Sequence, residues 1–141
     1  MARKDPRLEM LGGVELFTEC SKRELGQILA VAKEIEFDAG QDICVEGEPS
    51  GRFYLILDGT VAVKQRGRTM ATLGEGDYFG EIALIDGQPR TATCTAVTPV
   101  NTLAIAQFNF VPLLKEHAGL SHKLLLHLCS RLRAAEALLT D

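Results

Sequence analysis

Glu81 and Arg90 lie close to each other in sequence within residues 74–96, GEGDYFGEIALIDGQPRTATCTA. Arg90 presents a planar fork of N–H donors, which matches the oxygens of a phosphate group. Glu81 only accepts hydrogen bonds when it is ionised, so it suits a sugar hydroxyl and repels a second phosphate. These residue types favour a binding site for a small anion that carries a sugar.

The backbone around these two side chains suits the same ligand. Glu81 opens a short helix-like run that ends at Ile85, and the amides that open a helix have no intrahelical partners and can hold an anion. Gly80 lets a ligand approach the main chain closely. The sequence DGQP at 86–89 ends the run, because Asp-Gly favours a turn and Pro lacks a donor. Residues 91–96 then alternate hydroxyl and small apolar side chains, as in a half-buried strand.

A simpler interpretation is a surface turn in which Glu81 and Arg90 pair with each other, as exposed opposite charges often do. The full string at 79–92, FGEIALIDGQPRTA, resembles the phosphate-binding cassette of the cyclic nucleotide-binding domain family without a gap. That family includes bacterial catabolite activator proteins, regulatory subunits of cyclic-nucleotide-dependent kinases and cyclic-nucleotide-gated channels.

The resemblance implies roles for individual residues. Glu81 and the Gly80 backbone would hold the ribose 2′-hydroxyl, while Arg90, Thr91 and the amide of Ala83 would hold the cyclic phosphate. The catabolite activators read the base with hydroxyl residues on the last helix, but Ala and Glu stand at 135 and 136 here, so a stacked arginine is the expected substitute. The expected ligand is cAMP, with cGMP as the alternative, and no metal. The predicted ligand-binding residues are Phe79, Gly80, Glu81, Ile82, Ala83, Arg90, Thr91, Ala92, Arg131 and Arg133.

The rest of the chain divides by periodicity into β-like and helical parts. Short β-like runs separated by turns favour a sandwich or barrel. With the resemblance, the predicted fold is mainly β: an eight-stranded jelly-roll β-barrel with an N-terminal helix and two C-terminal helices. The predicted strands are 34–37, 42–44, 52–57, 60–65, 69–73, 77–79, 91–97 and 101–106.

Helical periods frame the β-like region. Ser21 and Glu24 form a capping-box pattern ahead of a helix. A second helix is expected at 108–117, and Ala118-Gly119 is expected to break it from a third at 120–139. The third helix carries an apolar a/d seam of Leu125, Leu128, Leu132, Ala135 and Leu139. That seam predicts packing against the chain's own barrel, a homodimer interface through 120–139, or a lid over the ligand.

Length and composition set the broad class. The 141 residues fit one domain, which we expect at 13–141 after an N-terminal tail at 1–12. The net charge of −4 and the lack of a Lys/Arg run argue against DNA contact by this chain. The sequence has no apolar run long enough to span a membrane and begins without a signal-peptide pattern, so a cytoplasmic location is expected.

Cysteines and histidines give no sign of catalysis. The cysteines at 20, 44, 94 and 129 lack CxxC spacing and are interpreted as buried reduced thiols. Every histidine (117, 122 and 127) follows the β-like region, which argues against a metal-dependent cupin, and no nucleophile–base pair is visible. We therefore expect a regulatory sensor domain that is not an enzyme, with its output supplied by another chain or segment. A nucleotide-free interaction module of the same fold is the alternative.

Overall fold

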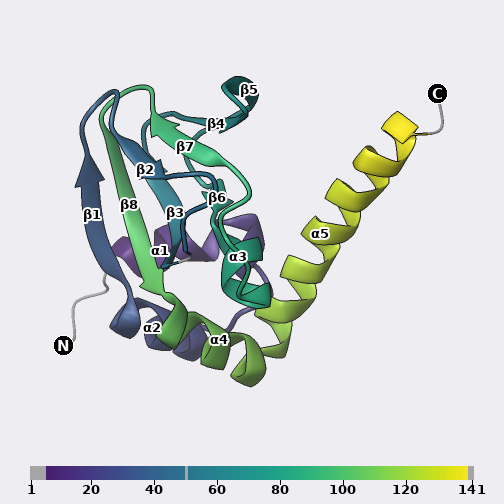
Figure 1. Ribbon diagram of the computed structural model, residues 1–141. Helices are drawn as coiled ribbons and strands as arrows, with labels where there is room; N and C mark the ends of the chain where they lie inside the picture. Colours follow the sequence, from purple (N-terminus) through teal and green to yellow (C-terminus); the bar gives the residue numbers. More distant parts are fainter. Residues whose placement is uncertain (1–5, 50, 140–141) are drawn as a thin grey trace. The chain divides into compact units, whose positions relative to one another are not determined.

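The computed structural model describes residues 6–49 and 51–139, and the side chains of residues 82–84 lie outside the described part. The chain divides into two compact units. The β unit is Ala30–Pro112, and the helical unit combines the described residues up to Leu29 with those from Leu113 onward. The elements of both units are labelled in Figure 1.

Two antiparallel sheets form the β unit (Figure 1). In the described residues, each sheet has four strands, in the orders β1-β8-β3-β6 and β2-β7-β4-β5. The strands are β1 (Lys33–Phe37), β2 (Asp42–Cys44), β3 (Arg52–Asp58), β4 (Val61–Gln65), β5 (Arg68–Leu73), β6 (Tyr78–Phe79), β7 (Thr93–Ala96) and β8 (Val100–Ala106).

The strand pattern predicted from sequence is confirmed, with ends that differ by a few residues. In β7 the buried residues Cys94 and Ala96 alternate with the half-buried Thr93 and Thr95, as the alternation of small apolar and hydroxyl residues predicts. Among the described residues no ladder joins one sheet to the other. A sheet-based, mainly β fold with flanking helices is therefore established, while closure into a barrel stays a prediction.

The core of the β unit explains why these strands pack. Tyr54 and Phe79 stack with ring centroids 5.2 Å apart, and Tyr54 also meets Phe37 edge-on at 5.8 Å. Ile56 and Val61 are almost fully buried in the same cluster. Burying such side chains is the dominant favourable term in folding, at about 1.5–3 kcal/mol for each large apolar residue.

Helices make up the other unit, and α4 links it to the β unit. The helices are α1 (Pro6–Gly12), the short 3-10 helix η1 (Glu15–Phe17), α2 (Lys22–Val31), α4 (Gln107–Glu116) and α5 (Ala118–Leu139), and the β unit holds α3 (Glu81–Asp86). The predicted tail at 1–12 therefore contains helix α1, and Leu11 of this helix is fully buried. Residues 1–5 lie outside the described residues, and the boundary between 12 and 13 stays a prediction.

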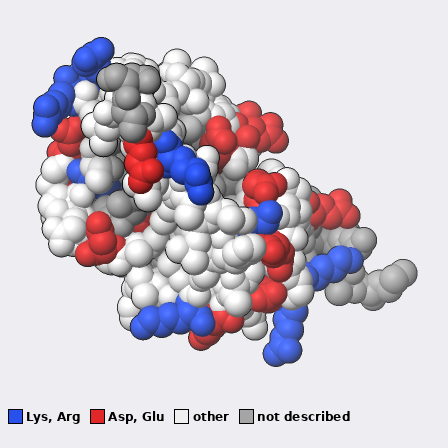
Figure 2. Space-filling model, turned by 90° about the vertical axis from the view of Figure 1, so that its right-hand side faces the viewer, with Lys and Arg blue, Asp and Glu red and all other residues white. Residues whose placement is uncertain are grey.

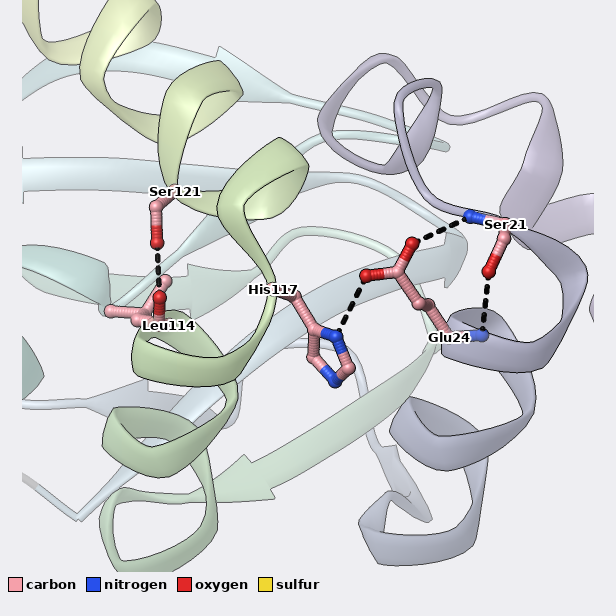
Figure 3. Close-up of polar contacts among 5 residues, drawn as sticks. All are labelled: Ser21, Glu24, Leu114, His117 and Ser121. Carbon is pink, nitrogen blue, oxygen red and sulfur yellow. Dashed lines mark hydrogen bonds and ion pairs between the residues drawn. The ribbon is translucent and has the colours of Figure 1, made fainter.

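The predicted capping box is present at the start of α2 (Figure 3). The Glu24 amide donates to Ser21 Oγ at 3.1 Å, and the Ser21 amide donates to Glu24 Oε1 at 3.0 Å. The second oxygen of Glu24 bonds His117 Nδ1 at 2.8 Å. One carboxylate therefore caps α2 and ties it to the junction of α4 and α5.

The break between α4 and α5 differs from the predicted one at Ala118-Gly119, and that prediction is wrong. The break falls at His117, whose carbonyl accepts from the Ser121 amide and so caps α5. Gly119 lies inside α5 because the helix packs closely there: a Cβ on it would lie 2.7 Å from the Glu19 carbonyl oxygen. Pro112 lies in the interior of α4, where a proline removes one helical hydrogen bond.

The long helix α5 changes character along its length. Leu120 and Leu124 are buried, whereas the seam residues Leu125 and Leu132 are each 60% exposed and Leu139 is 85% exposed. Among the described residues no helix is both long and apolar enough to cross a membrane.

The cysteines also differ from expectation. Cys44 and Cys94 are buried as predicted, but Cys20 is half-buried and Cys129 is exposed on α5. The prediction of a buried Cys129 is wrong, because it rests on apolar sequence neighbours. On a helix with so few buried positions, apolar neighbours do not imply burial.

Candidate functional site

The predicted site residues Phe79, Gly80 and Glu81 lie where one short strand ends and one short helix begins. β6 ends at Phe79, Gly80 takes a left-handed φ of 93°, and α3 begins at Glu81. The helix ends at Asp86, one residue after the predicted end at Ile85, and Asp86 accepts a hydrogen bond from the Gln88 amide at 2.9 Å in the turn that follows. The chain then continues without regular secondary structure to Arg90.

Arg90 is anchored at both its backbone and its side chain. Its amide donates to the Glu48 carbonyl at 2.8 Å, and its own carbonyl accepts from the Gly47 amide at 2.9 Å. The guanidinium donates from Nη1 to the Gly80 carbonyl at 3.0 Å and from Nη2 to the Arg52 carbonyl. With only 8% of its surface exposed, Arg90 is a buried cation held in place by main-chain groups.

Gly80 is required for this arrangement. A Cβ at this position would lie 2.6 Å from Arg90 Nη1 and 2.7 Å from the Arg52 carbonyl oxygen. The sequence predicts that Gly80 allows a ligand to come close to the backbone. In the structure, the groups that come close are the Arg90 guanidinium and the β3 main chain.

A pocket of about 350 Å³ opens beside Arg90. This volume is within the usual range for small-molecule sites. Two arginines, Arg52 and Arg90, and one glutamate, Glu48, are the charged residues that line it. The Tyr54 ring also lines it, and burial raises the pKa of its phenol, so Tyr54 contributes a neutral hydroxyl. The lining residues are Ile43, Cys44, Val45, Glu48, Pro49, Gly51, Arg52, Tyr54 and Arg90.

The structure brings together some of the predicted site residues. Arg90 donates a hydrogen bond to the Gly80 carbonyl. Glu81 is the next residue after Gly80 and is only 3% exposed. Thr91 is exposed beside Arg90, and Ala92 is half-buried.

Other predicted residues lie elsewhere or outside the described part. Phe79 is a core residue stacked on Tyr54. Ile82 and Ala83 belong to α3, but their side chains are outside the described residues. Arg131 and Arg133 are exposed on α5, which belongs to the helical unit.

Sequence reasoning missed the pocket residues that come from the segment before β3 and from the start of β3. Residues 47–51, GEPSG, are interpreted from sequence only as a turn between strands, yet Glu48, Pro49 and Gly51 line the pocket. Arg52 is interpreted only as the start of a strand. A charged residue directly after a Gly/Pro-rich turn was the available signal, but nothing local tied it to a segment 38 residues later, where the Arg52 carbonyl meets Arg90.

On the face drawn in Figure 2, Lys and Arg side chains are interspersed with Asp and Glu side chains. Within the described residues, no group of three or more His, Cys, Asp or Glu side chains could hold a metal ion.

Comparison with known proteins identifies the family. The family model for the cyclic nucleotide-binding domain matches residues 34–117, which is more than half of the chain. The cyclic nucleotide-gated potassium channel mll3241 of Mesorhizobium japonicum is 34% identical over 102 residues, covering 72% of this chain and 28% of the channel. This chain therefore corresponds to a minor part of that relative's length.

Solved structures show the same relationship. The catabolite activator protein of Thermus thermophilus matches with a TM-score of 0.82 and 29% identity, over 89% of this chain and 62% of that chain. The cAMP-bound PfPKA-R matches with a TM-score of 0.73 and 27% identity, over 76% of this chain and 38% of that chain. The region that the family model matches includes α3 and Arg90, and the chain belongs to the cyclic nucleotide-binding domain family.

Proposed function

We propose that this chain is a regulatory sensor domain that binds a cyclic nucleotide, with the cyclic phosphate on Arg90 and the ribose on Glu81. The observation that carries the proposal is the Arg90 guanidinium, buried at a pocket wall and held by the carbonyls of Gly80 and Arg52. A guanidinium has more N–H donors than these bonds use, so it can also donate to phosphate oxygens. Because it is already fixed, little side-chain entropy is lost when the phosphate binds.

Glu81 supports the sugar half of the proposal. It is buried at the first position of α3, directly after the glycine whose carbonyl accepts from Arg90. A buried carboxylate next to a phosphate site suits a neutral hydroxyl and disfavours a second phosphate. This combination favours a cyclic nucleotide over a nucleoside triphosphate. We further propose Thr91 and the Ala83 amide as phosphate donors, with Phe79, Ile82 and Ala92 shaping the site.

The preferred base is proposed to be adenine. The similar PfPKA-R structure contains cAMP, which supports this choice, and cGMP is the alternative. Arg131 and Arg133 are proposed to contribute to base recognition by stacking, since guanidinium groups stack well on planar rings. The location is proposed to be cytoplasmic.

Isothermal titration calorimetry with cAMP tests the central assignment. Removing one partner of a buried hydrogen-bonded charge pair costs about 2–5 kcal/mol. Arg90→Ala should therefore weaken cAMP binding by roughly 30-fold or more. Arg90→Lys should also bind poorly, because an ammonium keeps the charge but lacks the planar fork that meets both carbonyls and phosphate.

Arg68→Ala is the matched control, since Arg68 is an exposed arginine at the start of β5 and lies outside the pocket lining. It should bind cAMP like the wild type. Circular dichroism melts of all variants separate loss of binding from loss of fold. Near-wild-type affinity in a folded Arg90→Ala protein would remove Arg90 as the phosphate ligand. A folded wild type that binds neither cAMP nor cGMP would favour a nucleotide-free interaction module instead.

The exposed seam of α5 supports a further part of the proposal, a homodimer through 120–139 whose C-terminal helices change position when nucleotide binds. Leu125, Leu132 and Leu139 are spaced as a coiled-coil seam and are exposed in the single chain. Sedimentation velocity should show a concentration-dependent dimer, and Leu125→Glu with Leu132→Glu should abolish it. A protein that stays monomeric at high concentration, with and without cAMP, would contradict the dimer. The output protein or domain is proposed to respond to these helices.

A further inference from the structure

Two thiols face each other across a pair of strands in the β unit. β2 and β7 are antiparallel neighbours, and their register sets Cys44 opposite Cys94. A bulge between Asp42 and Cys44 produces this alignment. Both side chains are buried in the same core cluster, at 6% and 5% exposure. The pairing register and the shared cluster therefore make the two thiols neighbours in the core.

The backbone geometry of such a pair permits a disulfide. Directly opposite residues in antiparallel strands have Cα atoms about 4.5–5.5 Å apart. Disulfides form between Cα atoms about 4.4–6.8 Å apart when the Cβ atoms point the same way. Cys44 and Cys94 are paired across the two strands and their side chains belong to one buried cluster, which favours this geometry.

The two thiols are not equivalent. Cys44 lines the pocket that contains Arg90, whereas Cys94 is absent from the lining. The neighbouring Cys94 thiol, together with the positive charge of Arg90, lowers the pKa of the Cys44 thiol despite its burial. The Cys44 thiol and burial raise the pKa of Cys94. Because Cys44 is the thiol of the pair that lines the pocket, it is the one that an oxidant in the pocket would reach, and Cys94 is placed to resolve the product.

We propose that Cys44 and Cys94 are a modification site, a dithiol that a hydroperoxide entering the nucleotide pocket oxidises to an intramolecular disulfide. The Cys44 thiolate attacks one peroxide oxygen, the O–O bond breaks, and a sulfenic acid forms as water or an alcohol leaves. The Cys94 sulfur then attacks the sulfenic sulfur, and the S–S bond forms as the hydroxyl leaves with the Cys94 proton as water. Two thiols lose two electrons and two protons, and hydrogen peroxide becomes two waters.

The disulfide should alter the pocket. A disulfide places its sulfurs about 2.05 Å apart, much closer than two sulfurs that are not bonded to each other. β2 leads directly into the segment whose Gly47 and Glu48 bond the Arg90 backbone, and β7 begins shortly after Arg90. Drawing β2 and β7 together therefore shifts both segments that fix Arg90. This consequence rests on the proposed nucleotide function, and the expected loss of cAMP affinity is roughly tenfold.

Mass spectrometry of the full chain tests the disulfide without reference to nucleotide. The protein carrying Cys20→Ser and Cys129→Ser serves as the background, because neither residue lies in the pocket and Cys129 is exposed to intermolecular oxidation. Hydrogen peroxide should remove two hydrogens from its intact mass and yield a Cys44–Cys94 linked peptide, which dithiothreitol reverses. Recovery of both peptides as free thiols or as separate higher oxides would overturn the proposal.

Calorimetry with cAMP then tests the consequence. Peroxide should weaken binding by the background protein about tenfold, and dithiothreitol should restore it. Adding Cys94→Ser to that background should give a protein whose cAMP affinity peroxide does not reversibly lower. A linked peptide with unchanged affinity would overturn the regulatory role. Absence of cAMP and cGMP binding by the reduced protein would count against the proposed function, while the mass spectra would still decide the disulfide.

Discussion

The two units of this chain connect distant segments by different kinds of bond. In the β unit, main-chain groups dominate: the strands are joined by ladders, and even Arg90 directs its side chain to the carbonyls of Gly80 and Arg52. In the described part of the helical unit, three side-chain pairs at 2.8 Å connect the N-terminal segments with the start of α5 and the junction before it. They are Glu15–Lys123, Glu19–His122 and Glu24–His117. Two of the three include a histidine.

Arg90 is therefore held by main-chain groups of the β unit, whereas the ion pairs described above lie in the helical unit. Main-chain bonds do not titrate in the physiological range, so the geometry around Arg90 should change little with pH. Exposed ion pairs typically contribute only about 0–1 kcal/mol. His117 is buried, and within the described residues its Nε2 has no hydrogen-bond partner. The helical unit should therefore open at a lower free energy than the β unit.

The largest expected effect on cAMP affinity comes from adding a side chain at Gly80, next to Arg90. Gly80→Ala and Gly76→Ala both place a side chain at a positive φ, 93° and 86° respectively, and such strain costs about 1–3 kcal/mol. Only at Gly80 would the new Cβ meet Arg90 and the Arg52 carbonyl, whereas at Gly76 nothing lies within 4 Å. Calorimetry should show that Gly80→Ala loses cAMP affinity roughly 30-fold or more and that Gly76→Ala retains it. Equal losses would mean that left-handed strain alone matters, and that Arg90 is not held by close packing.

This contrast between two glycines shows what the sequence could predict. The sequence indicates a turn at Gly76 and a close approach to the backbone at Gly80, and the strands, the capping box and α3 followed from local periodicity and turn chemistry. What Gly80 packs against was not readable, because the Arg52 carbonyl reaches it through strand pairing. The same is true of the alignment of Cys44 with Cys94, which depends on a bulge in β2.

The hydrogen-bond partners of the histidines could not be predicted from the sequence either. The steps of five residues between them indicate that they share no helix face, but give no partners. His117 finds Glu24 only because α2 packs near the start of α5, and the helix break falls at this paired residue. Long-range packing, and not local propensity, therefore decided the details that sequence reasoning missed.

A second prediction concerns the ribose contact in the β unit. If Glu81 accepts the ribose 2′-hydroxyl, 2′-deoxy-cAMP should bind the wild type roughly 10-fold more weakly, because hydrogen bonds to charged groups contribute about 1.5–3 kcal/mol. Glu81→Gln should lose most of this discrimination. Competition binding with the two ligands measures both values. Equal affinity of the wild type for both ligands would remove Glu81 from the ribose site.

Replacing two helical glycines of the helical unit with alanine should change the free energy of unfolding in opposite directions. At Gly26 of α2, nothing lies within 4 Å of the position that a Cβ would occupy, so Gly26→Ala should raise the free energy of unfolding by about 0.5–1 kcal/mol. Gly119→Ala should lower it by about 1–3 kcal/mol, because its Cβ would press on the Glu19 carbonyl. Urea unfolding of both variants measures the difference. Stabilisation by both substitutions would show that the start of α5 does not pack tightly on the Glu19 segment.

The smallest expected effect is a pH dependence confined to the helical unit. The Ser21 amide and the His117 ring hold the pKa of Glu24 below its ordinary value of 4.5. Because the folded state has the lower pKa, the unfolded state binds more protons in this range, so these contacts stabilise the fold above about pH 4.5. Their contribution is lost as the pH falls through the lower, folded-state pKa. Glu24→Gln lacks this contribution at every pH.

Amide hydrogen exchange of the wild type and Glu24→Gln, followed from about pH 6 to pH 3, measures this contribution. After correction for intrinsic exchange rates, α2 and the start of α5 should be less protected in the variant than in the wild type at about pH 6. This difference in protection should disappear as the pH falls below 4.5, while the strands of the β unit keep equal protection in both proteins. Glu75→Gln, which changes an exposed residue of a β-unit turn, is the control and should match the wild type throughout. A gap that does not vary with pH would mean that Glu24 stabilises α2 by packing, and that the difference between the units does not rest on ionisable contacts.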